Sequence, residues 1–527
     1  MTAMTGTLGL VRLIGRNDRV RIVVWVLAIP AAVLGTASSV KGLYPTQAEL
    51  SAAAAAIRGN ASQIALNGPD RALDTLGGRA AFEVANFGLV GIALMSLLMV
   101  GRHTRGEEES GRAELVRAGP LGRYAGLAAP GLVVAAMNLA VGAAIALGLL
   151  ALSLPAAGSL VLGASLAAVG LAFAGVAALA AQAAAATRAA HALSGTALVL
   201  AFALRAVGDV GSGSMSWLSP LGWAQYSRPF AGERWWPLLL AVGVAGSCVV
   251  AAGALSAQRD LGAGIIAPRP GAPTASRSRG RPLGFAVRLE RASLLGWAAA
   301  VFLGGLALGA LGRDVDQLIA DNQSALDVLA QGSAASLVDS FFATFLVLMG
   351  LAAAGFALQC IQRLRAEEVS ARAEAVLVTA FSRRGWAGGH LAVALGGSVG
   401  VLAAAGAGTG LGYGAATADA GQVARLMAAA LVHVPAVWVL VGLAAALFGL
   451  APRAVASAWG ALAACLLLAV LGQLLDAPGW VRGISPFRHV PPMPAAPLAI
   501  GPLVVLTAVA AGLVGLGLTA FERRDIG

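Results

Sequence analysis

The sequence predicts an all-α polytopic membrane protein, with about twelve transmembrane helices arranged as two parallel, pseudo-symmetric six-helix halves. Three observations predict this fold class. The 527-residue chain is 58% apolar and only 12% charged, whereas soluble domains carry roughly 25% charged residues. Long apolar runs recur along the whole chain, and a charged segment between them is duplicated. Lipid, rather than water, is therefore expected to solvate most of this chain.

The apolar runs predict the individual membrane spans, because a bilayer core takes roughly 20 helical residues to cross. The run 191–207 is the weakest, since it is short and ends at Arg205. The 69 glycines indicate close packing of membrane helices through small residues. The predicted spans are 22–40, 82–100, 127–152, 159–182, 191–207, 237–256, 293–311, 341–358, 389–410, 426–450, 455–474 and 496–519.

The basic residues predict the orientation of these spans, because Lys and Arg concentrate in cytoplasmic loops. With the N-terminus inside, 25 of the 36 basic residues fall in the inside segments. Both termini are therefore expected in the cytoplasm, and the first span is expected to be retained, since no small-residue cleavage site follows it. The net charge of +11 then reflects topology and contact with anionic membrane lipid, and not nucleic-acid binding.

Several kinds of chemistry are excluded by residue counts. Lys41 is the only lysine and follows Val40, so the chain has no P-loop, which needs a Gly-Lys pair. Three cysteines and five histidines are scattered without the spacing of metal ligands. We therefore predict no catalytic residue, no metal site and no cofactor in this chain.

A charged segment after the second span recurs after the eighth. Residues 105–123 and 365–383 match at nine of nineteen positions at a constant offset of 260. We call these segments the first and second charged loops. The identical residues in the first loop are Arg105, Glu107, Glu108, Ser110, Arg112, Ala113, Glu114, Val116 and Arg123.

This duplication predicts the domain organisation. Residues 1–256 form a first six-span half and 293–527 a second, joined by a Pro-, Ser-, Gly- and Arg-rich cytoplasmic linker at 257–292. Weaker echoes keep the same order in both halves. They are a Trp after basic residues (Trp25 and Trp297), an Ala-Leu-Asp triplet (72–74 and 325–327) and a Ser-Pro pair (219–220 and 485–486). Six spans per copy give both halves the same orientation, as in parallel-repeat transporters.

Within each charged loop the spacing predicts a short, solvated helix. Glu108 and Arg112 form an i,i+4 pair in the favourable order, as do Glu368 and Arg372. Thr104 and Glu107 have the spacing of a capping box at the helix start, and Gly119-Pro120 ends the first loop's helix.

Charged inner loops occur in any polytopic protein, but the rule that places basic residues inside is nearly indifferent to Glu. Acidic positions repeated in both copies therefore favour a surface that meets a cytosolic partner.

At these residues the sequence resembles the membrane subunit of an ABC exporter of the ABC-2 group, with a type V-like fold. It is most similar to the fused twelve-span permeases of actinobacterial antibiotic and multidrug exporters, of the tetronasin or polyketide-antibiotic type. The resemblance is carried by Thr104–Arg112 with Glu114, by the second copy at Glu367–Glu374, and by Leu218–Trp223.

The resemblance implies a coupling helix in each half that docks on two copies of a cytosolic ABC ATPase, which would bind ATP and Mg²⁺. The chain itself would be non-catalytic and would move amphiphilic drugs or polyketide-type antibiotics out through a bacterial plasma membrane, contributing to antibiotic resistance. Interfacial helices would lie at Leu8–Arg21 and within 257–292, and re-entrant helices at 208–236 and 475–495. The implied docking residues are Glu107, Glu108, Arg112, Glu114, Glu367, Glu368, Arg372 and Glu374.

The second copy departs from the family pattern. Ala371 stands where the first loop has Gly111, and Phe487–His489 replaces Leu221–Trp223. The two docking sites are therefore expected to be unequal.

Candidate substrate-lining residues lie on the second and eighth spans, because equivalent spans would meet at the pseudo-twofold axis. Packing against other helices or lipid is the alternative role for each. Met and Phe surfaces suit an apolar substrate of variable shape. The candidates are Asn86, Phe87, Met95, Met99, Phe341, Phe342, Phe345 and Met349.

Two other functions stay open. A proton-coupled multidrug antiporter is also a six-plus-six protein, but it needs intramembrane carboxylates, and Glu83, Asp209 and Asp339 all lie at span ends. A membrane-embedded enzyme or envelope scaffold would need clustered acids or histidines at one face. The acidic residues Asp314, Asp316, Asp321 and Asp327 are interpreted instead as a solvated face.

Overall fold

The computed structural model describes residues 2–260, 262–265, 281–320, 337–379, 381–471 and 478–524. Every regular element within these ranges is a helix. The chain divides into two compact units, unit 1 (Met1–Pro270) and unit 2 (Gly271–Gly527). The prediction of an all-helical protein is thus confirmed for the described residues.

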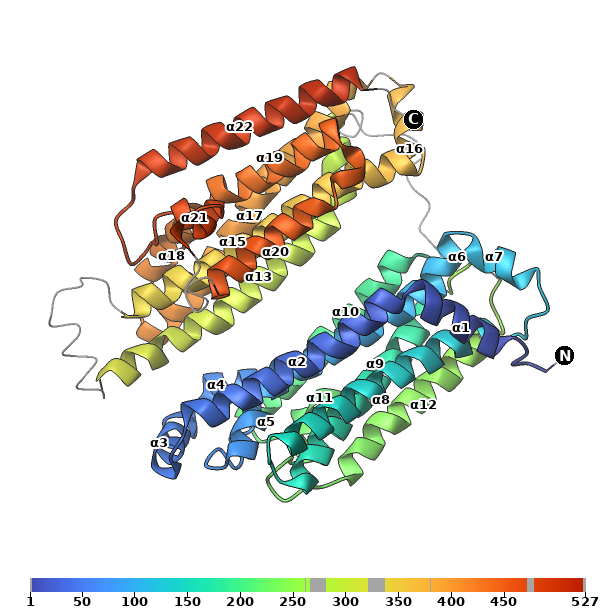
Figure 1. The fold of residues 1–527 in the computed structure, drawn as a ribbon, viewed down its shortest axis with the longest axis vertical. Coiled ribbons are helices and arrows are strands. Elements are labelled where there is room, and N and C mark those ends of the chain that lie inside the picture. The colour runs from blue at the N-terminus through green and yellow to red at the C-terminus, as the bar shows by residue number, and fades with distance from the viewer. Residues whose placement is uncertain are drawn as a thin grey trace. The chain divides into compact units, whose positions relative to one another are not determined.

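Unit 1 is a bundle of long apolar helices with short helices at its two ends. Figure 1 shows α1, α6 and α7 together at one end and α3 and α4 at the other. The long helices are α2 (Arg19–Leu43), α5 (Leu76–Gly101), α8 (Ala125–Ala151), α9 (Ala156–Ala183), α10 (Thr187–Val210) and α12 (Trp236–Ser256). The short ones are α1 (Thr7–Asn17), α3 (Gln47–Ile57), α4 (Ala61–Asn67), η1 (Arg102–Gly106), α6 (Glu107–Glu109), α7 (Arg112–Arg117), η2 (Met215–Leu218) and α11 (Pro220–Tyr226).

Helix α9 is the centre of unit 1, where it packs against α5, α8, α10 and α12. Small residues allow α8 and α9 to approach closely. A Cβ atom on Gly142 would lie 2.6 Å from the carbonyl oxygen of Gly163, and one on Gly163 would lie 2.3 Å from that of Gly142. The glycine content therefore has the packing role that the composition predicted for membrane helices.

Unit 2 is a second bundle whose short helix α16 lies at the end where α22 terminates (Figure 1). Its helices are α13 (Pro282–Ala320), α15 (Leu337–Val369), α16 (Arg372–Leu377), α17 (Arg383–Thr417), α18 (Gly421–Leu431), α19 (Val434–Leu450), η3 (Pro452–Ala454), α20 (Ser457–Leu471), α21 (Gly479–Arg482), η4 (Pro486–His489) and α22 (Ile500–Arg523).

Eleven helical stretches among the described residues are long and apolar enough to cross a membrane. Eleven of the twelve predicted spans correspond to them. The remaining predicted span, 455–474, corresponds to α20, which has 15 residues and ends where the described range ends at residue 471.

The predicted span 426–450 is not one continuous helix. It consists of α18 and α19, which are separated at Val432 and His433. Pro435 lies in the first turn of α19 and has no N–H to donate to the carbonyl of Leu431, which favours a break in the helix there.

The polar segments before the last helix of each unit contain short helices. In unit 1 the Ser219 hydroxyl accepts a hydrogen bond from the N–H of Leu221, and Pro220 occupies the first position of α11, a favoured helix start. In unit 2 the corresponding Ser485 and Pro486 begin the 3₁₀ helix η4.

Residues 261 and 266–280 of the predicted linker lie outside the described residues, as do Asp321 and Asp327 and the side chains of Asp314 and Asp316. Residues 282–292 are the first turns of α13. At the N-terminus, by contrast, α1 is a separate amphipathic helix that ends at Asn17, and α2 starts at Arg19. Asp18, between them, is central to the site described next.

Candidate functional site at the charged loops

The two charged loops share one backbone shape. In the first, α6 ends at Glu109 and Gly111 takes a left-handed conformation (φ +73°) before α7 begins at Arg112. In the second, α15 ends at Val369 and Ala371 takes the same conformation (φ +58°) before α16 begins at Arg372. Each loop is therefore two helical segments joined by a left-handed turn, instead of the single short helix that the spacing predicts.

This turn changes the predicted ion pairs. Arg112 pairs with Glu107, with 2.8 Å between Nε and Oε2, and not with Glu108 as predicted. Arg372 likewise pairs with Glu367 at 2.9 Å, and not with Glu368. The i,i+4 rule holds only along a continuous helix, and the left-handed residue between the partners interrupts it.

The predicted capping box at Thr104 is also wrong. Helix α5 continues without a break into the π-helical turn η1 and then α6, so no helix begins at Thr104. Its hydroxyl donates to the carbonyl of Val100 at 2.6 Å. A capping box needs free N–H groups at a helix start, and here they are already bonded within the helix.

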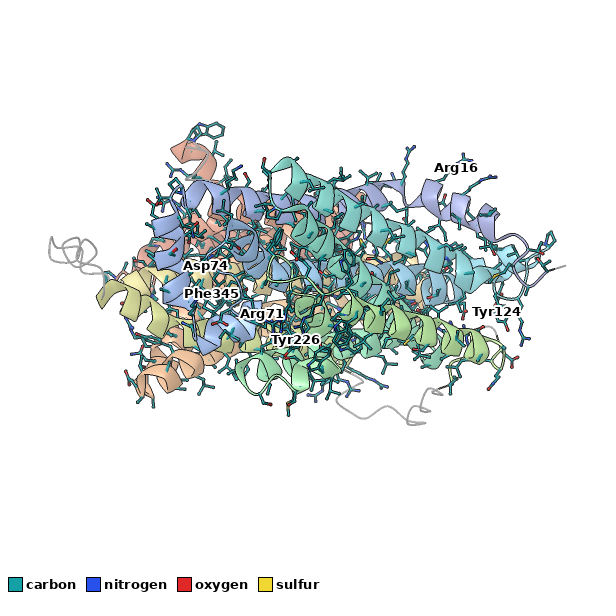
Figure 2. The ribbon with its side chains drawn as sticks, turned by 90° about the horizontal axis from the view of Figure 1, so that it is seen from below. Arg16, Arg71, Asp74, Tyr124, Tyr226 and Phe345 are labelled. Atoms are coloured by element: carbon teal, nitrogen blue, oxygen red, sulfur yellow. The ribbon has the colours of Figure 1, made fainter. Side chains whose placement is uncertain are left out.

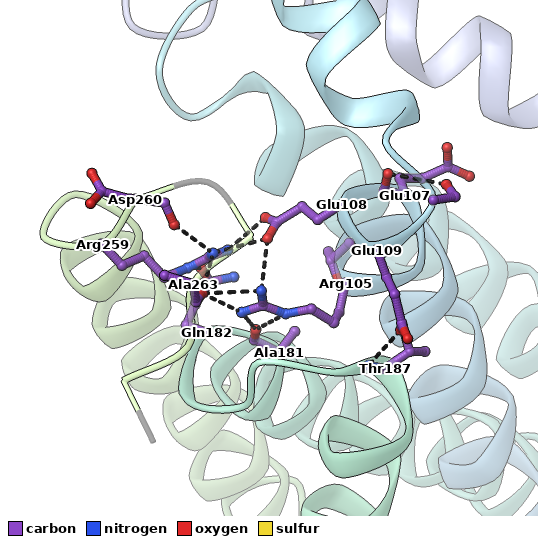
Figure 3. Close-up of polar contacts among 12 residues, drawn as sticks. Arg105, Glu107, Glu108, Glu109, Ala181, Gln182, Thr187, Arg259, Asp260 and Ala263 are labelled. Atoms are coloured by element: carbon purple, nitrogen blue, oxygen red, sulfur yellow. Dashed lines mark hydrogen bonds and ion pairs between the residues drawn. The ribbon is translucent and has the colours of Figure 1, made fainter. Parts of the chain in front are cut away.

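Glu108 lies inside a network of arginines, shown in Figure 3. Its carboxylate accepts from Arg105 at 3.0 Å and from Arg259, just beyond α12, at 2.6 Å. The Arg105 side chain is 1% exposed and also donates to the carbonyls of Ala181 and Ala263. These contacts tie the first charged loop to the ends of α9 and α12.

Glu368 is bound in the same way in unit 2. Arg365 lies 3.0 Å from its carboxylate, and Arg524, directly after α22, lies 2.7 Å from it. The guanidinium of Arg524 also packs over the rings of Phe448 and Phe521, at 5.3 and 5.6 Å from their centroids. The second charged loop is thus tied to the end of the last helix of unit 2.

A second carboxylate anchors the start of the first loop. Asp18 is 5% exposed and lies 2.7 Å from Arg102, 2.6 Å from Arg21 and 2.9 Å from His103. Desolvation by burial raises the pKa of Asp18, but the hydrogen bond and charge of Arg102, with His103 and Arg21, outweigh it and lower the pKa below its ordinary value.

Glu290 has the equivalent position in unit 2. It is 2% exposed and lies 3.5 Å from Arg363. Asp18 precedes Trp25 by seven residues and Glu290 precedes Trp297 by the same spacing, while His103 and Arg363 differ by the loop offset of 260. This correspondence is present in the sequence. It becomes visible only when the segments around Trp25 and Trp297 are aligned with one offset and the charged loops with another.

A cavity of about 450 Å³ opens beside the first charged loop, between α1, α7 and the start of α8. Its apolar wall includes Leu10, Ile14 and Leu127. Three of the four docking residues predicted in the first loop line the charged wall: Glu107, Glu108 and Arg112. The fourth, Glu114, lies on the exposed face of α7, as does its counterpart Glu374 on α16.

Four of the eight predicted substrate-lining residues are buried in the hydrophobic cores of the two units. Met95 and Met99 are 0% and 2% exposed in the core of unit 1, and Phe342 and Phe345 are 0% and 6% exposed in unit 2. Phe341 and Met349 are half-buried, and Phe87 is 41% exposed. The side chain of Asn86 lies outside the described part of the structure. Their lining role stays a prediction.

At the opposite end of unit 1, polar residues connect α10 to its neighbours. Arg205, 1% exposed, donates to the carbonyls of Ala65 and Leu66, and Ser216 donates to Asp209 at 2.6 Å. The guanidinium of Arg71 lies 4.9 Å from the centroid of the Tyr226 ring. Figure 2 shows these two residues well apart from Arg16 and Tyr124, which lie at the charged-loop end. The contacts of Arg205, Ser216 and Tyr226 hold the segment that precedes α12 in place.

Sequence reasoning missed the roles of Arg259 and Arg524. Both were counted only as inside positive charges, because their partners lie 151 and 156 residues away in the chain. Glu109 was missed too, although its carboxylate accepts from the N–H of Thr187 at the start of α10, a favourable place for an acid.

Apolar helices long enough to span a bilayer, with charged loops fixed at one end of each bundle, define a polytopic α-helical membrane protein. A family model described as the C-terminal domain of the multidrug efflux system permease Rv1217c matches residues 280–522. The chain is 42% identical over 529 residues to the multidrug efflux system permease protein Rv1217c of Mycobacterium tuberculosis, covering 100% of this chain and 96% of that protein. The chain belongs to this family of multidrug efflux permeases.

Proposed function

We propose that this chain is the membrane subunit of an ATP-driven ABC-2 type exporter, which moves amphiphilic drugs or polyketide-type antibiotics out of the cell. Its termini would lie in the cytoplasm of a bacterium, under the plasma membrane. The observation that carries the proposal is the charged loop, which follows the second long helix of each unit with the same left-handed turn and the same Glu–Arg pair.

Two similar loops suit two copies of one partner. Each presents an exposed carboxylate, Glu114 or Glu374, and an exposed apolar residue, Leu115 (78% exposed) or Val378 (88% exposed). The cavity beside the first loop adds a concave surface of mixed polarity. Together these features supply apolar anchors within a charged rim, as protein interfaces need.

The energy source is proposed to be the partner, because the single lysine of this chain is not in a P-loop. Two identical cytosolic ABC ATPase subunits would bind ATP and Mg²⁺, and hydrolysis there would reset the membrane halves. The membrane chain would supply the pathway, with the Met and Phe side chains of α5 and α15 becoming accessible as the bundles move.

The carboxylates near the helix ends support this proposal over proton coupling. Glu83 lies 2.8 Å from Arg79, and Asp339 lies 2.6 Å from Arg425. Both carboxylates are thus paired with a guanidinium, and a proton carrier would have to break such a pair in each cycle.

The test is reconstitution of the chain in vesicles with a candidate ABC ATPase, taken from the neighbouring gene if that gene encodes one. We expect the two to co-purify, and drug efflux to need hydrolysable ATP and to survive a protonophore. Reversing Glu107 and Glu114 to Arg should abolish co-purification, whereas Glu49→Arg on α3, at the other end of unit 1, should not. Efflux by the chain alone, driven by a proton gradient, would instead establish an antiporter.

A further inference from the structure

Glu108 and Glu368 are bound to the last long helix of their own unit by arginines that the loop duplication does not predict. Arg259 follows α12 and Arg524 follows α22, and these two residues are 265 positions apart, not 260. The same connection therefore forms in both units although the chain reaches it through segments of different length. Repetition of the contact, and not of the spacing, indicates that the contact itself is what matters.

Burial separates these carboxylates from the neighbouring pair of glutamates. The side chain of Glu108 is 9% exposed and that of Arg259 is 8% exposed, while Glu107 is 31% exposed. Glu368 is 5% exposed, and Glu367 is 14% exposed. A partner that formed its own ion pair with Glu108 or Glu368 would first have to break the internal one, and breaking a buried pair is costly.

Each of the helices held by these contacts packs mainly against one neighbouring helix. Only 17% of the residues in the most apolar stretch of each helix are buried, because α12 packs mainly on α9 and α22 mainly on α19. The ion pair is one of the polar contacts that connect the end of such a helix to the charged loop. In unit 2, Arg383 adds a hydrogen bond to the carbonyl of Arg524 at 2.9 Å.

We propose that Glu108 and Glu368 are positioning residues that transmit movement of each charged loop to the last helix of the same unit. This inference rests on the proposed function. It assigns Glu108 and Glu368 a role in coupling the loop to the last helix, instead of a role in docking. Movement of a loop would then shift α12 or α22 together with the polar segment that precedes it, η2–α11 or α21–η4.

The first test compares matched neutral variants in the reconstituted exporter. Glu108→Gln and Glu368→Gln should keep the affinity for the ATPase within about twofold but lower drug efflux about tenfold, a coupling loss of ordinary size. Glu107→Gln and Glu367→Gln, on the exposed side, should weaken ATPase binding instead. Arg524→Lys, which keeps the charge, should retain efflux where Arg524→Gln loses it. Loss of ATPase affinity in the Glu108 and Glu368 variants, equal to that in the controls, would overturn the proposal.

The second test uses the purified membrane chain without a partner, so that it does not depend on the proposed function. Hydrogen exchange should accelerate in the last turn of α22 and in the second charged loop of Glu368→Gln, while α17 keeps its protection. Size-exclusion chromatography should show an intact, monodisperse protein. Unchanged exchange at α22 in a folded variant would show that the ion pair does not hold this helix.

Discussion

The first and second charged loops have the same backbone turn but different supports. In unit 1, Arg105 is 1% exposed and makes hydrogen bonds to Glu108 and to two backbone carbonyls. In unit 2, the equivalent Arg365 is 28% exposed and pairs with Glu368. Glu108 and Glu368 thus both contact the end of the last helix of their unit. The two loops differ in how deeply they are buried.

Two further positions show the same trend. Glu109 bonds to the start of α10 in unit 1, whereas the equivalent Val369 in unit 2 is 69% exposed. Gly111 adopts its left-handed conformation freely, whereas Ala371 adopts it with a side chain. The first loop is therefore the more firmly anchored, which fits the expectation that the two docking sites are unequal.

The largest expected effect is the difference in stability between the alanine variants of the two equivalent arginines, Arg105 and Arg365. Arg105→Ala should lower the free energy of unfolding by about 3–5 kcal/mol, because a buried charge network loses its centre. Arg365→Ala should cost about 1 kcal/mol or less, as for partly exposed pairs. Denaturant titration of the purified chain measures both, with the exposed Arg372→Ala as control. Equal losses at the two positions would contradict the difference in anchoring.

The next effect concerns the partly exposed Glu107 and Glu367 and tests the unequal docking sites. Glu107→Arg should lower the affinity for the proposed ATPase partner about tenfold, since it places a like or unmatched charge at the interface. Glu367→Arg should lower it less, because Glu367 is the less exposed of the two. Titration of immobilised membrane chain with the ATPase gives both values. A larger effect at Glu367 would reverse the proposed order.

A smaller effect is expected at the left-handed residues. Gly111→Ala should destabilise the chain by about 1 kcal/mol, because an L side chain is strained at positive φ. Only backbone strain is expected, since a Cβ atom there meets nothing within 4 Å. Ala371→Gly should stabilise by up to about 1 kcal/mol for the opposite reason. Thermal unfolding of the two variants measures the change in stability. If both substitutions changed stability in the same direction, the loops would not be strained as described.

The smallest effect is the pH dependence of the Asp18 cluster. Because the folded pKa of Asp18 is lowered, its ionised form stabilises the fold above the ordinary value of 3.8, and this contribution disappears as the pH falls through the lowered pKa. Asp18→Asn should therefore reduce stability at pH 7, within about 1 kcal/mol because Arg21 and Arg102 are half-exposed. The deficit should shrink in acid. A deficit that grows as the pH falls would contradict this assignment.

Much of the fold could be predicted from composition and hydropathy, but local geometry at the site could not. The apolar runs located the long helices because every helix that crosses the bilayer core needs about the same number of apolar residues. The pairing of Glu107 with Arg112 was missed, since the left-handed turn at Gly111 depends on how the loop meets α9 and α12. The broken helix at His433 was missed as well, although Pro435 offered a local signal for it.

The amino-acid sequence by itself determined that this is a helical membrane protein with a repeated acidic and basic loop, because hydrophobic length and charge are properties of short segments. The tertiary structure decided which glutamate faces outward and which is enclosed. That choice depends on Arg259 and Arg524, which reach Glu108 and Glu368 from more than 150 residues away. Only the folding of each bundle brings such distant charges within hydrogen-bonding distance.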